Sequence, residues 1–179
     1  MSSCKGQNVY DCSLLEKTIF PISHEKALYE RVLYERVLSL NKQILPCLID
    51  SIDTQGTSLI GFINPIMSNL SYHFNQKGIM YAYLVDYILL KDSIETVEKN
   101  RNDNRADLTE PYGVYNLGII FKQDENNQPI LEPLTHEDMV KIKKMYLKWW
   151  KKNKGKPIET LREEFRNGNK ILQPPYVWL

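Results

Sequence analysis

The chain has 179 residues, a charged fraction of 25% and a formal net charge of +1 at pH 7. This length suits one domain with a full hydrophobic core and is too short for two. A nearly neutral chain is not drawn as a whole to nucleic acid or to an anionic membrane, so any electrostatic preference has to come from a local patch. No apolar run approaches the roughly 20 residues of a transmembrane helix, so the sequence predicts no membrane span.

The first half of the chain is expected to be mainly helical. Ser23 is a suitable N-cap for a first helix, whose apolar residues recur at helical spacing as far as about Lys42. A second apolar stretch runs from Ile44 to Ile52 and predicts another helix. Residues 56–75 are broken by glycine, proline and asparagine, and are expected to form a loop.

The best candidate for the central core element runs from Ile79 to about Lys91. This stretch is apolar around most of a helical circumference, which is typical of a buried helix. The polar residues 95–110 that follow predict an exposed loop. Residues 115–122 and 129–134 have β-like composition and flank a turn-forming cluster, so they predict one short hairpin.

The C-terminal third carries the clearest helix signals. Thr135 and Asp138 have the spacing of a capping box at the start of a helix that ends near Lys154. Pro157 suits the first turn of a last helix that ends at Gly168. The apolar residues of the first of these helices lie near one face: Met139, Ile142, Tyr146, Trp149 and Trp150.

Together these patterns predict a mainly α fold, a single-domain helical bundle with one short β-hairpin. The tail over residues 174–179 contains two prolines and two aromatic residues, and we expect it to fold back onto the last two helices.

No constellation of residues is typical of an enzyme. His24 and His136 are expected at the surface and His73 in half-buried packing, and no serine has the surroundings of a nucleophile elbow. No glycine-rich loop fits a phosphate or dinucleotide site, and no cysteine pair has metal-site spacing. We therefore expect no catalytic site, metal or cofactor. The alternative is a hydrolase of an envelope polymer, which requires carboxylates such as Asp50 and Asp86 to lie close together in a cleft.

The first residues resemble a lipoprotein junction. Residues 2–7, Ser-Ser-Cys-Lys-Gly-Gln, resemble the site at which bacterial lipoprotein signals are cut, particularly in the Bacteroidota. The resemblance implies that Cys4 carries the lipid anchor and that Met1 replaces a removed signal. The acidic run that marks surface export in this phylum is missing, which favours a periplasm-facing protein. Residues 1–11 are polar and predict a flexible tether, followed by a single domain over residues 12–179.

The lipoprotein resemblance also bears on a disulfide. The chain has three cysteines, an odd number. If Cys4 carries lipid, Cys12 and Cys47 form an even pair in an oxidising compartment, where a disulfide persists. Their bond would close a loop of about 35 residues and, on chain-entropy grounds, stabilise the fold by about 3–4 kcal/mol. Separate thiols are the alternative, because the sequence does not say whether the two can meet.

A basic cluster marks the long helix of the C-terminal third. Five of its lysines share one side of the helix: Lys141, Lys144, Lys148, Lys151 and Lys152. This basic face has several interpretations. It is either a solvated face whose last lysines oppose the helix dipole, or a docking surface for an acidic protein partner. A membrane-surface role is conceivable for a lipid-anchored chain. Nucleic acid is least favoured, because the tryptophans are expected in the core and leave no stacking platform.

The C-terminal sequence is similar to the end of envelope proteins of the Bacteroidota. The similarity rests on residues 146–154, 157–163 and 175–178, and the helix over residues 78–86 resembles one in the same proteins. Proteins of this kind are small helical lipoproteins, and some are regarded as immunity proteins that shield the periplasm from secreted toxins. The resemblance carries no functional residue over to this chain.

These observations predict a periplasm-facing lipoprotein that binds a protein partner, with neutralisation of an antibacterial toxin as the specific role. A structural or accessory envelope lipoprotein without a toxin partner is the main alternative. The lipid on Cys4 is expected to be the only link to the membrane, and the sequence leaves the oligomeric state open.

Overall fold

The computed structural model describes residues 10–19, 36–56, 77–90, 120–130 and 132–178. Helices predominate in this part of the chain and a small antiparallel sheet accompanies them, which confirms the predicted fold class. The elements, with short 3-10 helices labelled η, are η1 (Cys12–Leu14), α1 (Leu15–Ile19), η2 (Asn41–Ile44), α3 (Leu45–Asp50), α5 (Lys77–Leu89), β1 (Ile120–Gln123), β2 (Pro129–Ile130), α7 (His136–Asn153), α8 (Ile158–Arg166) and β3 (Tyr176–Trp178).

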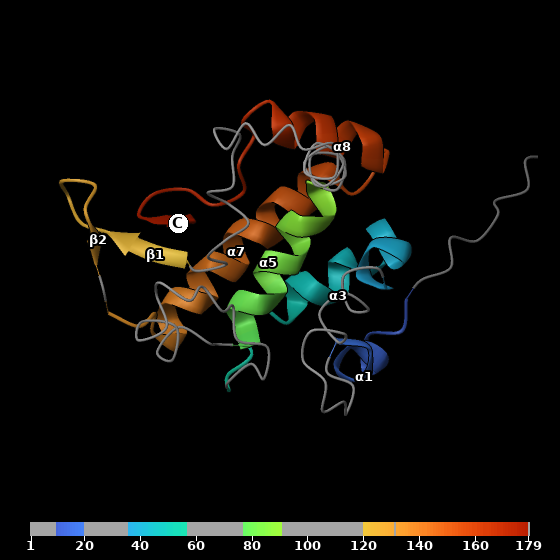
Figure 1. Cartoon of the computed structure of the whole chain (residues 1–179), viewed down its shortest axis with the longest axis horizontal. Helices are drawn as coiled ribbons and strands as arrows, with labels where there is room; N and C mark the ends of the chain where they lie inside the picture. The colour runs from blue at the N-terminus through green and yellow to red at the C-terminus, as the bar shows by residue number, and fades with distance from the viewer. Residues whose placement is uncertain (1–9, 20–35, 57–76, 91–119, 131, 179) are drawn as a thin grey trace, which may run out of the picture.

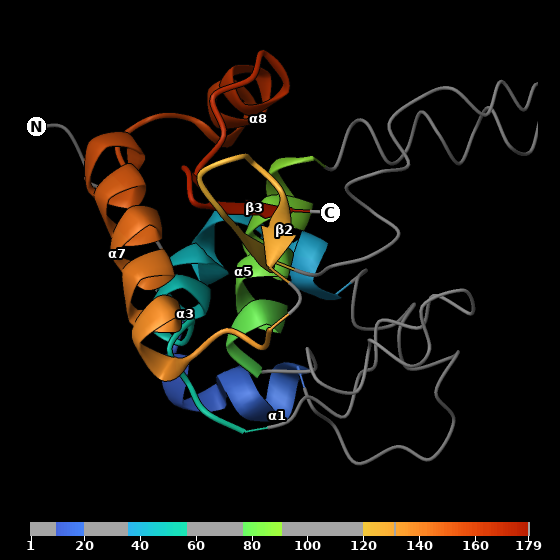
Figure 2. The same ribbon diagram turned by 90° about the vertical axis from the view of Figure 1, so that its left-hand side faces the viewer.

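Helix α5 forms the centre of the core, as its apolar circumference predicts. Its residues are buried without a break from Gly78 to Asp86, and again at Ile88 and Leu89. Helix α3 packs against both α5 and α7. Figure 1 shows α5 and α7 crossing the middle of the molecule with α8 at one end, and Figure 2 shows α3 beside them in the turned view.

The chain after α3 approaches the start of α5 most closely at Gly78. A Cβ atom at this position would lie 1.9 Å from the carbonyl oxygen of Ile52 and 2.8 Å from the Cε of Met139. Any side chain here would collide with backbone that has no room to move. Glycine at position 78 is therefore what lets α5 begin in contact with this segment.

The segment before α3 differs from the prediction of one helix down to about Lys42. Residues 36–40 are helical, but Asn41 adopts a φ of 53° and the chain continues as the 3-10 helix η2. Asparagine tolerates this left-handed conformation better than most residues. Helix α3 then begins at Leu45 with Pro46 in its first turn, where the missing N–H of proline costs no hydrogen bond.

Strand β1 is the middle strand of the sheet, with β2 and β3 paired antiparallel on its two sides. The turn between β1 and β2 is held by Asp124, whose Oδ1 accepts hydrogen bonds from the backbone N–H groups of Asn126 and Gln128, each at 2.8 Å. The predicted hairpin is therefore present, with strands at 120–123 and 129–130. Residues 115–119 and 131 lie outside the described ranges.

The sequence patterns do not predict the third strand, β3. It pairs Trp178 with Ile120 and Tyr176 with Lys122 in register. The aromatic tail folds back as expected, but one of the two helices that it contacts is the central helix α5, where Trp178 lies edge-on to Tyr83 with the ring centroids 6.2 Å apart.

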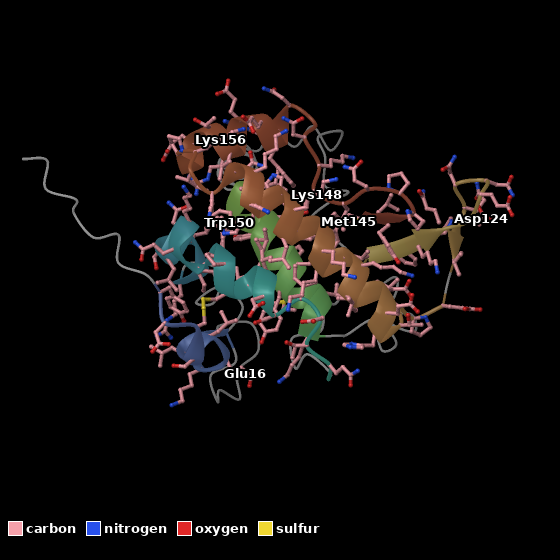
Figure 3. The ribbon with its side chains drawn as sticks, turned by 180° about the vertical axis from the view of Figure 1, so that it is seen from behind. Glu16, Asp124, Met145, Lys148, Trp150 and Lys156 are labelled. Atoms are coloured by element: carbon pink, nitrogen blue, oxygen red, sulfur yellow. A yellow bond between two sulfur atoms is a disulfide. The ribbon has the colours of Figure 1, made fainter. Side chains whose placement is uncertain are left out.

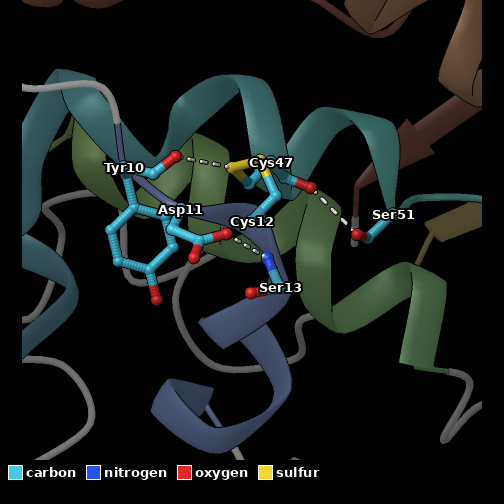
Figure 4. The surroundings of a disulfide bond; sticks show 6 residues. All are labelled: Tyr10, Asp11, Cys12, Ser13, Cys47 and Ser51. Atoms are coloured by element: carbon cyan, nitrogen blue, oxygen red, sulfur yellow. Dashed lines mark hydrogen bonds between the residues drawn. A yellow bond between two sulfur atoms is a disulfide. The ribbon is translucent and has the colours of Figure 1, made fainter.

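A disulfide between Cys12 and Cys47 fastens η1 to α3, with 5.3 Å between the two Cα atoms (Figure 4). This is the pair that the sequence offered as a candidate. Tyr10, from the segment interpreted as a tether, already packs against the core, and its carbonyl oxygen lies 3.9 Å from the Sγ of Cys47. Cys4 lies outside the described residues.

Arg162 of α8 is buried and links three parts of the chain. Its Nε donates a hydrogen bond to the carbonyl of Ile88 near the end of α5, and its Nη2 donates to the side chain of Asn41, each at 3.1 Å. A guanidinium group suits this position because it donates in several directions and satisfies a carbonyl at a helix end.

The described ranges do not include the predicted helix start at Ser23, most of the loop over residues 56–75, the loop over 95–110, or His24 and His73. In the part of the chain that is described, no helix is both long and apolar enough to cross a bilayer.

Candidate functional site

Helix α7 begins at a capping box, as predicted. The Thr135 hydroxyl accepts from the backbone N–H of Asp138 at 3.2 Å, and the Asp138 carboxylate accepts from the backbone N–H of Thr135 at 3.0 Å. These bonds satisfy donors that a helix start leaves unpaired. They fix the residue at which α7 begins.

The inner face of α7 is formed by Met139, Ile142 and Tyr146, all buried. Trp149 and Trp150 differ from the expectation of core residues, because both are only half-buried. Their ring centroids are 6.1 Å apart, and the ammonium group of Lys42 lies 5.8 Å from the Trp150 ring. The two tryptophans therefore form the edge of the core, and each keeps part of its surface exposed.

All five lysines of the predicted basic face are exposed. Lys141 forms an ion pair with Glu137 at 2.8 Å, one turn earlier on the same helix. Within the described part of the chain, the other four form no ion pair: Lys144, Lys148, Lys151 and Lys152. The structure thus leaves four positive charges of one helix face in solvent.

A groove of about 710 Å³ lies beside this face, between α7 and the chain that follows α8. The α7 residues that line the groove recur at helical spacing, and two of them are lysines of the basic face. The residues that line the α7–α8 groove are Met145, Lys148, Trp149, Lys152, Asn153, Lys156, Glu164, Gly168, Asn169, Lys170, Ile171 and Gln173. Figure 3 shows this side of the molecule, with Met145, Lys148 and Lys156 labelled along the helix and its exit.

Asn153 is the last residue of α7 and the one buried amide in the groove wall, with 4% of its surface exposed. Its Nδ2 donates to the carbonyl of Trp149 at 2.9 Å. Its Oδ1 is buried and has no hydrogen-bond partner among the described residues. Because only Nδ2 can donate to a carbonyl, the unpaired atom is the acceptor, and such an atom costs free energy until a donor reaches it.

Two residues of the groove lining, Lys156 and Glu164, form an ion pair with each other. The Lys156 ammonium lies 2.6 and 2.8 Å from the two carboxylate oxygens of Glu164. The carbonyl of Lys156 accepts a hydrogen bond from the ammonium group of Lys42. The charge of Lys156 is therefore already neutralised, in contrast to the charges of Lys148 and Lys152.

The carboxylate of Asp86 is buried near the C-terminal end of α5 and accepts two hydrogen bonds. The Tyr146 hydroxyl donates at 3.0 Å, and the indole N–H of Trp178 donates at 2.7 Å. Burial raises the pKa of Asp86 to about 7, and these two bonds only partly oppose the rise. Burial also raises the pKa of Tyr146 well above its ordinary value, so the phenol keeps its proton and acts as a donor.

Asp50 and Asp86 do not form the carboxylate pair that the hydrolase alternative requires. Asp86 is buried, whereas the Asp50 side chain is 79% exposed and lies 3.2 Å from the ammonium group of Lys143. Lys143 also pairs with Asp53 at 2.9 Å. The structure thus joins Asp50 with Asp53 through a lysine that ties α7 to α3.

A second buried carboxylate, Asp138, has the opposite character to Asp86. Burial alone would raise its pKa, but hydrogen bonds from Tyr176 and Thr135 outweigh burial and lower the pKa to about 2. The Tyr176 hydroxyl donates at 2.7 Å, and the ammonium of Lys122 lies 3.5 Å away. Asp138 is therefore a charged residue that holds β1 and β3 on the start of α7.

Two features of this region escape sequence reasoning. The groove forms because the chain after Gly168 returns beside α7. No local sequence pattern predicts that this segment lies there. The partners of Asp86 are 60 and 92 residues away in sequence. An aspartate inside a continuous apolar helix was the available signal, because a buried carboxylate requires donors from elsewhere in the fold.

The remaining candidate residues are placed as follows. His136 is the exposed first residue of α7, as expected for a surface histidine. Among the described residues, no group of histidine, cysteine and carboxylate side chains has an arrangement that holds a metal ion.

Comparison of the chain with protein-family models, with characterised proteins and with solved structures finds no match.

Proposed function

We propose that this protein binds an acidic protein partner through the basic face of α7. The specific role that we propose is immunity: a periplasm-facing lipoprotein that neutralises an antibacterial toxin. The basic face comprises Lys141, Lys144, Lys148, Lys151 and Lys152. The observation that carries the proposal is that four exposed lysines of this face form no ion pair with any of the residues that the structure describes.

The spacing of these lysines strengthens the argument, because it places like charges next to one another. Lys144, Lys148 and Lys152 follow one another at intervals of four residues, so successive lysines are neighbours on the helix surface. Like charges at this spacing destabilise a helix by about 0.2–0.5 kcal/mol a pair. Acidic side chains of a protein partner would offset this repulsion, and the gain would contribute to the free energy of binding.

The interpretation as a solvated face that opposes the helix dipole accounts for only part of the basic face. Lysines in the last turn of a helix stabilise the negative end of its dipole, and this explains Lys151 and Lys152. The effect fades beyond the last turn, so it does not explain Lys144 or Lys148, which lie in the middle of α7. Those two residues are the ones for which a partner is the better explanation.

The immunity role and the location are supported by sequence features. The lipoprotein-like residues around Cys4 and the similarity of the C-terminal third to envelope proteins supply the class of protein. A disulfide between Cys12 and Cys47 suits an oxidising compartment such as the periplasm. A small, disulfide-fastened core with a charged outer face is a suitable scaffold for binding an enzyme.

The test is affinity capture of the tagged protein from its native cell envelope, followed by mass spectrometry. We expect one stoichiometric partner, and we expect its capture to fall when Lys144, Lys148 and Lys152 are changed to Gln. The control removes three exposed positive charges outside the basic face, by changing Lys17, Arg36 and Lys154 to Gln. Equal capture by both variants would contradict the assignment of the basic face.

A second step separates immunity from an accessory role. The captured partner is purified, and its toxicity or enzymatic activity is measured with increasing amounts of the protein. Immunity predicts complete inhibition at a one-to-one ratio. A partner that shows no toxicity and no inhibition would point to the structural or accessory alternative.

The lipid anchor is tested separately from binding. The gene is expressed with its own upstream sequence, and cells are labelled with a radioactive fatty acid. The natural protein is expected to take up label and to enter the membrane fraction, and the Cys4→Ala variant is expected to do neither. Labelling that persists in the variant would contradict the anchor at this residue.

A further inference from the structure

We infer that the α7–α8 groove binds an extended acidic segment of the partner, in which carboxylates flank an apolar side chain. This inference rests on the proposed function and adds to it the surface and the chemistry of the bound segment. It divides the basic face into two parts. Lys148 and Lys152 line the groove, while Lys144 and Lys151 lie outside its lining.

The charges of the groove call for an acidic occupant. Lys148 and Lys152 stand on its α7 wall and Lys170 on the opposite side, all exposed and without an ion pair among the described residues. The one carboxylate of the lining, Glu164, is already occupied by Lys156. An excess of uncompensated positive charge therefore remains in a concave surface, where its field is stronger than on an open face.

The apolar part of the lining distinguishes a peptide from other anions. Met145 and Trp149 are half-buried, and Ile171 is buried in the groove. An adaptable thioether, an indole and an aliphatic residue are contacts for a side chain such as leucine. A bilayer surface does not enter a groove, and the one aromatic residue of the lining, Trp149, gives a nucleic acid no row of rings on which to stack its bases. A protein segment supplies both the carboxylates and the apolar group.

Asn153 adds a polar contact only after a local rearrangement. Its unpaired Oδ1 is an acceptor that suits a backbone N–H of an extended segment, but the atom is covered in this structure. A donor reaches it once neighbouring side chains of the lining move. The exposed lysines therefore provide the first recognition, and Asn153 adds a contact in the bound state.

The probe is a synthetic peptide in which glutamates flank a central leucine, and the matched peptide has glutamine in place of each glutamate. Binding is followed by two-dimensional NMR of the tryptophan indole N–H groups in the full-length protein. Trp149 lines the groove, whereas the indole of Trp178 is bonded to Asp86 in the core. The two signals thus report on the groove and on the fold in one spectrum, with Trp149 identified through a Trp149→Phe variant.

Two charge-reversal variants of equal net charge test the location. One carries Lys148→Glu and Lys152→Glu, in the groove, and the other carries Lys144→Glu and Lys151→Glu, outside its lining. We expect the acidic peptide to shift the Trp149 signal saturably and to leave that of Trp178 in place. Affinity should fall at least about tenfold in the groove variant and by about threefold or less in the other. The glutamine peptide should not bind measurably.

Three outcomes would overturn the groove: an equal loss in both variants, no saturable shift of Trp149, or tighter binding of a thymidine oligonucleotide at the same salt concentration. Capture of the native partner distinguishes a wrong assignment of the groove from a wrong proposed function. If the partner is lost by the Lys144/Lys151 variant and kept by the Lys148/Lys152 variant, the proposed function stands and the groove is wrong. If neither peptide nor native partner binds the natural protein, both are wrong.

Discussion

Two buried aspartates differ in their protonation because their surroundings differ. Asp86 accepts bonds from two side chains, yet it lies deep in the core and its pKa rises to about 7. Asp138 lies at a helix start, where a hydroxyl, a backbone N–H and a phenol donate to it, and its pKa falls to about 2. One residue is thus poised to be neutral and the other to be charged, with opposite consequences for stability.

The Asp86→Asn variant is expected to remove one pH dependence of stability. Because the folded state raises the pKa of Asp86 from 3.8 to about 7, it holds a proton that the unfolded chain releases between these values. The stability of the natural protein should therefore fall by about 4 kcal/mol as the pH rises through this window, and stay level above it. Asparagine has the shape of the neutral acid and does not titrate, so the stability of the variant lacks this dependence on pH.

The measurement is urea-induced unfolding of both proteins from pH 4 to pH 8. We expect the variant to be the more stable protein at pH 8 and the difference to vanish near pH 4. The contribution of Asp138 is common to both proteins, and it is lost only as the pH falls from about 4 toward 2. A constant difference across the range would show that Asp86 does not titrate there.

The Gly78→Ala variant is expected to be strongly destabilised. Its Cβ would overlap the carbonyl oxygen of Ile52, and relief requires a shift of α5 against the segment after α3. Overpacking of this kind costs about 1–3 kcal/mol or more, which thermal or urea unfolding would detect. Gly155→Ala is the matched control, because a Cβ there has no neighbour within 4 Å, and it should change stability little. Similar effects at both positions would contradict the close approach.

At the scale of elements, the parts that local sequence predicts are those with local causes. The capping box of Thr135 and Asp138 needs only a spacing of three residues, and α5 needs only an unbroken apolar run. Strand β3 has three residues and no usable periodicity, so its place beside β1 follows from pairing rather than from composition.

The candidate site divides in the same way. The lysines of the basic face were predicted to share one side of a helix, because helical spacing alone places them there. The groove escaped prediction, because its second wall comes from residues 164–173, which return beside α7 after a separate helix. Trp149 was assigned to the core for the same reason, since its periodicity reports a face of the helix and not what lies opposite.

The Lys148→Glu variant is expected to stabilise the free protein while weakening partner binding. Glutamate at this position would face Lys144 and Lys152 at a spacing of four residues, so two repulsive pairs become attractive. The gain should be about 1 kcal/mol at low ionic strength and should shrink in high salt. Urea unfolding at two salt concentrations measures it. Lys141→Glu is the contrasting change, because it breaks the pair with Glu137 and should destabilise the helix. No gain in the Lys148 variant would mean that the lysines do not repel one another.

At the scale of the whole molecule, the disulfide fixes the N-terminal segment to the core. Replacing Cys12 and Cys47 by serine is expected to lower the free energy of unfolding by about 3–4 kcal/mol, since the loop between them spans 35 residues. Urea unfolding with and without a reductant provides the check. The reductant should destabilise the natural protein and leave the double variant unchanged. A natural protein insensitive to reductant would contradict a stabilising role for the bond.

The bond between Trp178 and Asp86 also dictates an order of events during synthesis. The ribosome adds 92 residues after Asp86 before the indole that satisfies this carboxylate exists. Until then the apolar helix α5 has no complete partner surface, and strand β1 lacks its neighbour β3. The core therefore closes only when β3 has left the ribosome, and until then the incompletely covered surface of α5 exposes the growing chain to aggregation.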